Sequence, residues 1–238
     1  MVAKGRLSFA GVPLEDFGIY VSGYKTHGAP ERDQTVVSIP GRNGDLVYDN
    51  GRYFNTDVTY HIGLKNPAPA RAMELRNYLL SKNGYQRLED SFHPDEFRMA
   101  RYKGGFDPEI KVRGRVGELD IVFDCKPQRF LALGEQAIEK TSSPVTIWNP
   151  THMTAKPLIR VYGNGTVAIG NVTMTITNPS NPYVDVDCEL MDAYCGAANL
   201  NSCISTPTPG QFFELVPGNN NIVFTCTKII VIPRWWRL

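Results

Sequence analysis

Thiol side chains are candidates for metal binding, redox chemistry or nucleophilic catalysis. The sequence has five of them, at Cys125, Cys188, Cys195, Cys203 and Cys226. Their spacing includes no C-x-x-C pair, so it does not favour a zinc site. Cys188 and Cys226 fall on apolar strand faces, where we expect each thiol to pack as a small, inert hydrophobic group. Cys195 and Cys203 fall in a loop, where they can remain free or pair with each other.

The histidines form no metal-binding or catalytic pattern. They are His27, His61, His93 and His152, and none has a second ligand at metal spacing. The chain also has no G-x-S-x-G, H-E-x-x-H or Walker-type motif, the signatures of α/β-hydrolases, zinc proteases and P-loop nucleotide-binding proteins. We therefore predict no catalytic residue, no metal and no cofactor, and we expect that the protein is not an enzyme.

Two carboxylates and one glycine-bearing segment have both a chemical and a structural interpretation. Asp185 and Asp187 project from the same face of a predicted strand, and paired carboxylates can bind Ca²⁺ or perform acid–base chemistry. We favour the simpler interpretation, a solvated strand face. The segment 163–166 lacks the lysine and the following helix of a phosphate loop, so we predict a hairpin turn there.

The tryptophans offer a possible platform for a sugar ring. Trp235 and Trp236 are adjacent, and only one of two adjacent residues on a strand can face inward. We predict that one anchors the last strand in the core and that the other is exposed to a partner. Trp148 is a third aromatic candidate.

An irregular loop at 38–45 carries the strongest local signal. Its Pro, Gly and Asn-Gly pattern predicts a rigid turn-rich loop, and it contains neither a nucleophile nor a base. We predict a structural or interaction loop rather than an enzyme lid. Arg42 either pairs with a carboxylate of a neighbour or remains solvated. The predicted interface residues are Ile39, Pro40, Gly41, Arg42, Asn43 and Gly44.

The elements that position these residues are mostly strands. In the first part we predict strands at 18–24, 35–39, 46–48, 53–64, 85–88, 98–102 and 115–123. Asp49-Asn50-Gly51 predicts a tight hairpin turn. One helix is predicted at 70–82, with Ala72, Leu75 and Leu79 near one face, prolines before it and Asn-Gly after it.

The second part shows only the two-residue periodicity of strands. Alternating patterns cover 167–176, with a turn at Gly170-Asn171, and 183–190; closing strands follow at 222–226 and 228–232. Short strands with Gly, Pro and Asn turns predict an antiparallel sandwich. The predicted fold class is therefore mainly β: a β-rich first part with one packed α-helix, followed by an antiparallel β-sandwich.

Composition divides the 238-residue chain and excludes several classes of protein. Residues 1–133 carry 36 charged side chains and residues 134–238 carry 13, which predicts a domain boundary near Gly134. The formal net charge of +1 provides no long-range field to recruit nucleic acid or an anionic membrane. No apolar run is long enough for a membrane helix, and we expect no secretory export because no signal-peptide pattern is present.

Short motifs in a fixed order connect the sequence to a known family. They are GVPLEDFGIY at 11–20, IPGRNGDL at 39–46, DNGRYFN at 49–55, the helical region 71–85, RLED at 87–90, FRMA at 97–100, FDCKP at 123–127, KP at 156–157, GNG at 163–165, the segment 185–194, LVPGNN at 215–220 and IPRW at 232–235. Over about 230 residues the sequence resembles the distal tail proteins of phages with long non-contractile tails, the siphophage tail component family.

The resemblance implies a structural role at the virion tail tip, after assembly in the host cytoplasm. It implies an N-terminal ring-forming β-sandwich domain (1–133) with one α-helix and a long hairpin, and a C-terminal galectin-like β-sandwich domain (134–238). In such a protein we expect the loop at 38–45 to make subunit or tube contacts. Six copies would form a ring around a channel through which DNA passes without being specifically bound. The implied partners are the tail tube protein, the tail-tip hub or tail-associated lysin protein, and receptor-binding proteins, with no membrane. Residues 134–238 leave no room for the long arm that some members carry, which implies a minimal hub.

Two other functions remain to be compared with this one. A carbohydrate-binding module at the tail tip would use the galectin-like half together with Trp148, Trp235 and Trp236. It requires an exposed aromatic ring surrounded by polar side chains, which the sequence alone does not locate. A wall hydrolase is disfavoured because no acid and base stand out as a pair.

Overall fold

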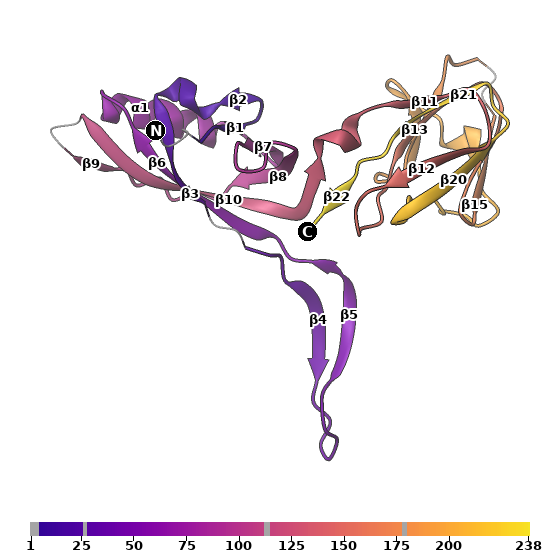
Figure 1. Cartoon of the computed structure of the whole chain (residues 1–238), viewed down its shortest axis with the longest axis horizontal. Helices are drawn as coiled ribbons and strands as arrows, with labels where there is room; N and C mark the ends of the chain where they lie inside the picture. The colour runs from indigo at the N-terminus through magenta and orange to yellow at the C-terminus, as the bar shows by residue number, and fades with distance from the viewer. Residues whose placement is uncertain (1–4, 26–27, 112–114, 178–179) are drawn as a thin grey trace. The chain divides into compact units, whose positions relative to one another are not determined.

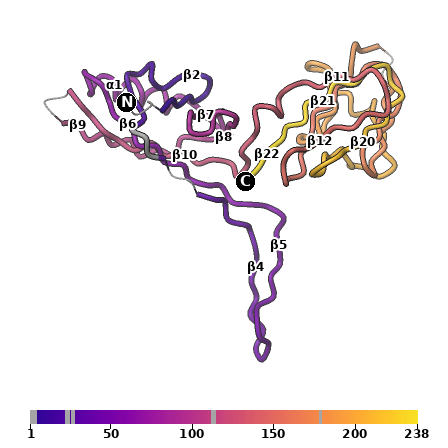
Figure 2. Tube along the Cα trace, viewed as in Figure 1, coloured from indigo at the N-terminus to yellow at the C-terminus, as the bar shows by residue number. Residues whose placement is uncertain are grey.

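The computed structural model describes residues 5–25, 28–111, 115–177 and 180–238, and the chain divides into two compact units. One unit comprises Met1–Arg129 with Leu238, and the other comprises Phe130–Arg237. Figures 1 and 2 show the course of the chain through each unit. Strands predominate and the described residues include one α-helix, so the predicted mainly β fold is confirmed. Among these residues, no helix is long and apolar enough to cross a membrane.

The N-terminal unit is built on one antiparallel sheet. Its strands run in the order β2 (Val12–Pro13), β1 (Leu7–Phe9), β7 (Gln86–Asp90), β8 (Glu96–Tyr102), β10 (Val116–Leu131), β6 (Thr56–Leu64) and β3 (Ile19–Lys25), and β9 (Glu109–Lys111) also pairs with β10. A 3₁₀ turn, η1 (Leu14–Phe17), connects β2 to β3. The sequence predicted only the first half of β10, which continues for eight residues beyond Phe123.

The helix α1 (Ala68–Leu80) begins and ends two residues before its predicted bounds. Pro67 precedes its first residue and Pro69 lies in its first turn, where a missing N–H costs no helical hydrogen bond. Leu75 and Leu79 are fully buried and Ala72 nearly so, as predicted from their spacing. They pack into the same core as the aromatic side chains of Phe9 and Phe123, whose ring centroids are 4.8 Å apart.

A long hairpin of β4 (Arg32–Val37) and β5 (Leu46–Tyr53) belongs to the same unit. The predicted turn at Asp49-Asn50-Gly51 is wrong, because β5 runs continuously through these residues. The register places residues 50–52 opposite Asp33 alone, so Asn50-Gly51 forms a β-bulge. Gly51 has φ +74° there, and a positive φ is the property that Asn-Gly offers to a bulge as well as to a turn.

The C-terminal unit is an antiparallel sandwich. One sheet has the order β11 (Ile138–Lys140), β21 (Lys228–Ile232), β13 (Leu158–Tyr162), β16 (Val184–Asp187), β17 (Asp192–Cys195) and β18 (Ala198–Asn199). The other has β12 (Val145–Asn149), β20 (Gly218–Phe224), β14 (Gly165–Ile169), β15 (Val172–Ile176) and β19 (Ile204–Ser205). Ile159 and Val161 from the first sheet share one core with Val167 and Ile222 from the second.

Two 3₁₀ turns and a short strand complete this unit: η3 (Ala132–Glu135), η4 (Asn201–Cys203) and β22 (Trp236–Arg237). The predicted turn at Gly170-Asn171 is confirmed, since Ile169 and Val172 pair across it. The predicted hairpin at 163–166 is wrong. It connects β13 to β14, which lie in different sheets, so the glycines carry the chain from one layer of the sandwich to the other.

Asp185 and Asp187 lie on the outward side of their strand, but the prediction that they are solvated is wrong. Arg160 pairs with Asp185 through two hydrogen bonds of 2.7 and 2.8 Å, and Arg234 pairs with Asp187 through two of 2.7 Å. The residues Asp185 and Asp187 are only 3% and 2% exposed. Two-point arginine contacts of this kind are strong and directional, and they replace the water that the carboxylates would otherwise bind.

The Asp187 carboxylate also ends its strand. Its Oδ1 accepts hydrogen bonds from the backbone N–H groups of Glu189 (3.0 Å) and Leu190 (3.1 Å), so the chain turns there instead of continuing to residue 190 as predicted. Leu190 is consequently exposed. Burial alone would raise the pKa of Asp187, but the hydrogen bonds from Arg234 and from these N–H groups outweigh it and lower the pKa.

Replacing Arg234 should therefore destabilise the C-terminal unit. We expect Arg234→Ala to lower its free energy of unfolding by about 2–4 kcal/mol, because the buried Asp187 carboxylate loses its partner. Urea unfolding monitored by tryptophan fluorescence measures this unit alone, since all three tryptophans lie in it. The exposed Lys156 provides the control, and Lys156→Ala should change the free energy by less than about 0.5 kcal/mol.

The free energy of unfolding that is lost in Arg234→Ala should also depend on pH. A pKa that folding lowers contributes stability above the unfolded value, about 3.9 for Asp, and this contribution is lost as the pH falls through the folded value. The difference in free energy of unfolding between the unmodified protein and Arg234→Ala should therefore be largest at pH 7 and should shrink below about pH 4. A difference that stays constant down to pH 2.5 would show that Arg234 acts through packing and not through its charge.

Candidate functional site: the β4–β5 hairpin and its root

The loop at 38–45 forms the tip of the β4–β5 hairpin, and the six predicted interface residues, 39–44, are all exposed on it. The N–H of Arg42 donates to the carbonyl of Ile39 at 3.1 Å. Pro40 and Gly41 occupy the two central positions of this turn, and Gly41 has φ +80°. Proline followed by a glycine with positive φ is the signature of a type II turn, so the residue types by themselves account for the local conformation.

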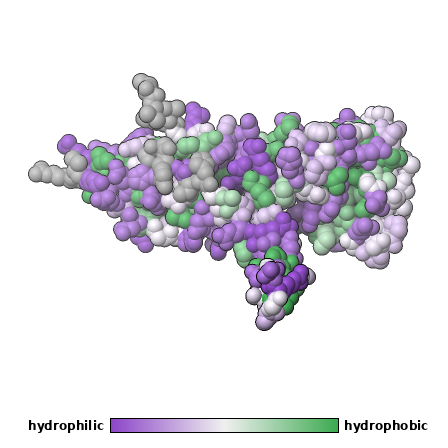
Figure 3. Space-filling view, turned by 60° about the horizontal axis from the view of Figure 1, so that its bottom comes forward, coloured by the Kyte–Doolittle hydropathy of each residue, from purple (hydrophilic) through white to green (hydrophobic). Residues whose placement is uncertain are grey.

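Both faces of the hairpin below this loop carry exposed apolar side chains. Val36 pairs with Val47 on one face, and Val37 pairs with Leu46 on the other. Their exposed fractions range from 48% to 57%, and that of Tyr48 is 68%. Figure 1 shows no other element of the unit beside the outer part of the hairpin, and apolar surface is visible on it in Figure 3. A two-stranded ribbon with no covered face is marginal in water.

A polar network holds the strands together at the bulge. Asp33 accepts hydrogen bonds from Asn50 at 2.8 Å and from Arg52 at 2.6 Å, and Arg32 pairs with Asp49 and with the hydroxyl of Tyr53. The Asp49 carboxylate also accepts the N–H of Gly51 at 2.9 Å. These contacts lower the pKa of Asp33 and Asp49, mainly through the hydrogen bonds from Asn50 and Arg32, respectively.

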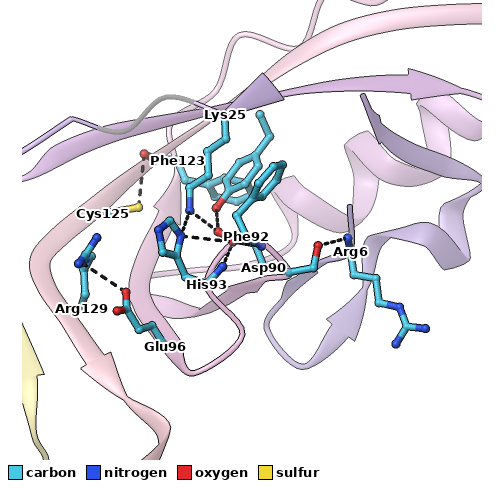
Figure 4. Close-up of polar contacts among 11 residues, drawn as sticks. Arg6, Lys25, Asp90, Phe92, His93, Glu96, Phe123, Cys125 and Arg129 are labelled. Carbon is cyan, nitrogen blue, oxygen red and sulfur yellow. Dashed lines mark hydrogen bonds and ion pairs between the residues drawn. The ribbon is translucent and has the colours of Figure 1, made fainter. Parts of the chain in front are cut away.

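Asp90 holds together the root of the hairpin, where β3 leads into it and β6 leads out of it (Figure 4). Lys25 is the last residue of β3, before the hairpin, and Tyr60 lies on β6, after it; the two residues are register partners. The Lys25 Nζ and the Tyr60 hydroxyl both donate to Oδ2 of Asp90 at 2.5 Å. Oδ1 of Asp90 accepts the N–H groups of Phe92 and His93.

Burial governs the titration of this cluster. It lowers the pKa of Lys25, although the hydrogen bond to Asp90 opposes the shift, and it raises the pKa of Tyr60 well above its usual value. Burial would also raise the pKa of Asp90, but the bonds from Lys25 and Tyr60 outweigh it and lower the pKa. His93 Nδ1 lies 3.2 Å from the Lys25 Nζ.

A lysine beside a histidine and an aspartate is a combination that some enzymes use as a nucleophile with a neighbouring general base. The cavity beside them has a volume of about 10 Å³, which is about the minimum for one water molecule. No substrate fits against these groups in this conformation, so we assign the cluster a structural role.

The cysteines and the remaining described histidines belong to other parts of the chain. Cys188 and Cys226 are buried as predicted, and burial raises the pKa of Cys188 to about 12 and also raises that of Cys226. Cys195 and Cys203 are both free. His27 lies outside the described residues, and the described ones contain no group of three potential metal ligands.

The tryptophans are only partly as predicted. Trp235 is 3% exposed and anchors the core, as expected for one of the adjacent pair. Trp236 is half-buried rather than exposed, because its indole N–H donates to the carbonyl of Thr154 at 3.0 Å. Trp148 is 62% exposed on β12.

Sequence reasoning missed the apolar strands of the hairpin as a surface. The available signal was a run of apolar residues on both sides of the loop, Val36-Val37 and Leu46-Val47-Tyr48. Adjacent apolar residues in a strand point to opposite faces. This pattern predicts a strand covered on both sides, and the described residues of the N-terminal unit supply neither cover.

Solved structures show where this fold occurs, although no family model and no curated protein matches the chain. The structure of the SPP1 Dit protein, described as a paradigm of the hub adsorption apparatus in phages that infect Gram-positive bacteria, matches with a TM-score of 0.77 at 14% identity, over 98% of this chain and 99% of that one. A chain of the phage p2 baseplate, activated with Sr, matches with a TM-score of 0.54 at 9% identity, over 99% and 98%. The same baseplate activated with Ca gives 0.53 at 8%, over 97% and 98%.

These matches place the fold in a class that occurs in the hub and baseplate structures of phages. Within that class, this chain has the fold of the SPP1 Dit protein along nearly its whole length.

The clamp at the root gives a prediction for the N-terminal unit. Lys25→Met should lower its free energy of unfolding by about 2–4 kcal/mol, because it removes the cation from an Asp90 side chain that is only 8% exposed. Urea unfolding monitored by circular dichroism should show an earlier transition for this unit. The tryptophan transition of the other unit should not move.

The exposed lysine Lys65 provides the matched control. Lys65→Met should leave both transitions within about 0.5 kcal/mol of the unmodified protein. Equal effects of the two substitutions would contradict the clamp, as would a shift of the tryptophan transition in Lys25→Met.

Proposed function

We propose that this protein is a structural distal tail protein of a long-tailed phage. It joins the tail tube to the tail tip as a hexameric ring and serves as a scaffold for host-adhesion proteins. The support is the match to the SPP1 Dit hub protein over 98% of the chain, together with the motif order in the sequence. The role is mechanical and not catalytic.

The uncovered hairpin is the observation that carries the proposal. Its valines and leucine are half-exposed on both faces, and its outer edges leave strand hydrogen-bonding groups available. A neighbouring copy in a ring would cover this surface in a head-to-tail contact, in which two different patches of the same chain meet. Each copy then donates one hairpin and receives another, which closes a ring without leaving a free edge.

The proposal assigns the remaining parts as follows. Residues 1–133 form the ring domain around a channel for DNA, which passes without specific binding, and residues 134–238 form the outward domain. The tail tube protein and the tail-tip hub or lysin protein contact the ring on its two sides, and receptor-binding proteins attach to the outward domain. The protein assembles in the host cytoplasm and resides at the virion tail tip, with no membrane partner.

A charge placed on the hairpin should block assembly without affecting the fold. Light scattering over a concentration series should detect a particle of roughly 160 kDa, the mass of six copies of a 26.6 kDa chain. Val47→Asp should abolish this particle and leave the melting temperature unchanged, because Val47 is 52% exposed. Leu80→Asp, at 56% exposure on α1, is the matched control and should still assemble.

Assembly can require a template, so the same proteins should be mixed with purified tail tube protein and viewed by electron microscopy. We expect the unmodified protein and Leu80→Asp to decorate tube ends and Val47→Asp not to do so. The hub proposal fails if the unmodified protein remains monomeric at high concentration and never decorates a tube end.

The loop at the tip provides a second test of the same surface. Arg42→Ala should weaken assembly several-fold without lowering the melting temperature of the monomer, because the side chain lies on an exposed turn and rigid loops lose little entropy on docking. A lower melting temperature with intact assembly would mean that Arg42 serves the fold of its own chain.

A further inference from the structure

The outward face of the five-stranded sheet in the C-terminal unit carries an exposed aromatic ring. β12 forms one edge of this sheet, and it directs Ile147 and Asn149 into the core while Thr146 and Trp148 face outward. The ring of Trp148 lies beside Gly218, where a Cβ would be 3.6 Å from its Cζ3. The adjacent position therefore has no side chain to cover the indole.

Amide side chains lie directly across from this strand. Asn219 pairs with Trp148 and Asn221 pairs with Thr146 in the register of β12 and β20, so all four side chains share one face. Asn219 and Asn221 are both exposed, and no hydrogen bond within the described part of the chain uses their amides. Their donors and acceptors are consequently available to a ligand.

The same face carries no charge. Across the strands of the sheet, its outward residues are Thr146, Trp148, Asn219, Asn221, Val223, Thr166, Ala168, Thr173, Thr175 and Ser205. The opposite sheet of the sandwich differs, since its outward face holds Arg160, Asp185 and Lys228. An uncharged polar face is thus a property of one sheet and not of the whole unit.

The chemistry of the face selects its ligand. A pyranose ring has an apolar C–H face, which can pack on an indole, and a rim of hydroxyl groups, each of which donates and accepts hydrogen bonds as an amide does. A nucleic acid or an acidic polymer would require cations on the surface. A protein partner bound mainly by apolar burial would find only Trp148 and Val223 as large apolar groups.

We propose that this face binds a neutral oligosaccharide, with one sugar ring stacked on Trp148 and neighbouring hydroxyl groups held by Asn219, Asn221 and Thr146. Such a site would add direct contact with surface glycans to the mechanical role of the ring. It does not depend on the ring, because all of these residues belong to one sheet of one unit.

The test uses the full chain on an array of oligosaccharides that includes cellohexaose, maltohexaose and the hexamer of β-linked N-acetylglucosamine, with acidic glycans beside them. The best neutral binder is then titrated by tryptophan fluorescence and by calorimetry. We expect Trp148→Ala to weaken binding by about tenfold or more and Trp148→Phe to retain affinity within about threefold, since a phenyl ring still stacks. Asn219→Ala should also weaken binding.

Leu190→Ala provides the control, because Leu190 is 67% exposed but lies outside this face, and it should bind as the unmodified protein does. The proposal is overturned by no binding to any neutral glycan, by a preference for acidic glycans, or by equal binding of Trp148→Ala. Ring assembly measured on the same variants separates the two proposals, since Trp148→Ala should still assemble.

Discussion

The arrangement of the N-terminal unit depends on one carboxylate that binds side chains from two strands, β3 and β6, at once. Asp90 accepts hydrogen bonds from Lys25 and Tyr60, the residues that precede and follow the hairpin, and from two backbone N–H groups of its own loop. A buried charge of this kind is stable only while all of its partners remain in place. The hairpin therefore extends from a fixed root, although its own outer strands have no covered face.

The C-terminal unit uses the same principle with arginine in place of lysine. Arg160 and Arg234 each bind a carboxylate of β16 through two hydrogen bonds. Oδ1 of Asp187 also accepts the backbone N–H groups that form the turn after it. The planar guanidinium fixes direction as well as distance. The carboxylates of β16, on the outward face of one sheet, are consequently occupied by internal ion pairs. The outward face of the other sheet carries no charge and is available to a ligand.

These features support the proposed role in assembly. Each unit has a hydrophobic core built from its own residues, whereas several exposed apolar side chains lie together on the hairpin. A surface of this composition is stabilised by a partner. We propose another copy of the chain as that partner.

The sequence by itself determined the mainly β class, the helix with its buried Ala72, Leu75 and Leu79, and the turns at Pro40-Gly41 and Gly170-Asn171. Each of these depends on short-range periodicity or on the backbone preference of one or two residues. Only the tertiary structure decided the features that depend on contacts between distant residues. Asn50-Gly51 became a bulge because β4 continues opposite it, and Asp185 and Asp187 became buried because arginines 25 and 47 residues away cover them. The Asp90 clamp joins residues 30 and 65 positions apart, a separation at which local sequence carries no information about which side chains meet.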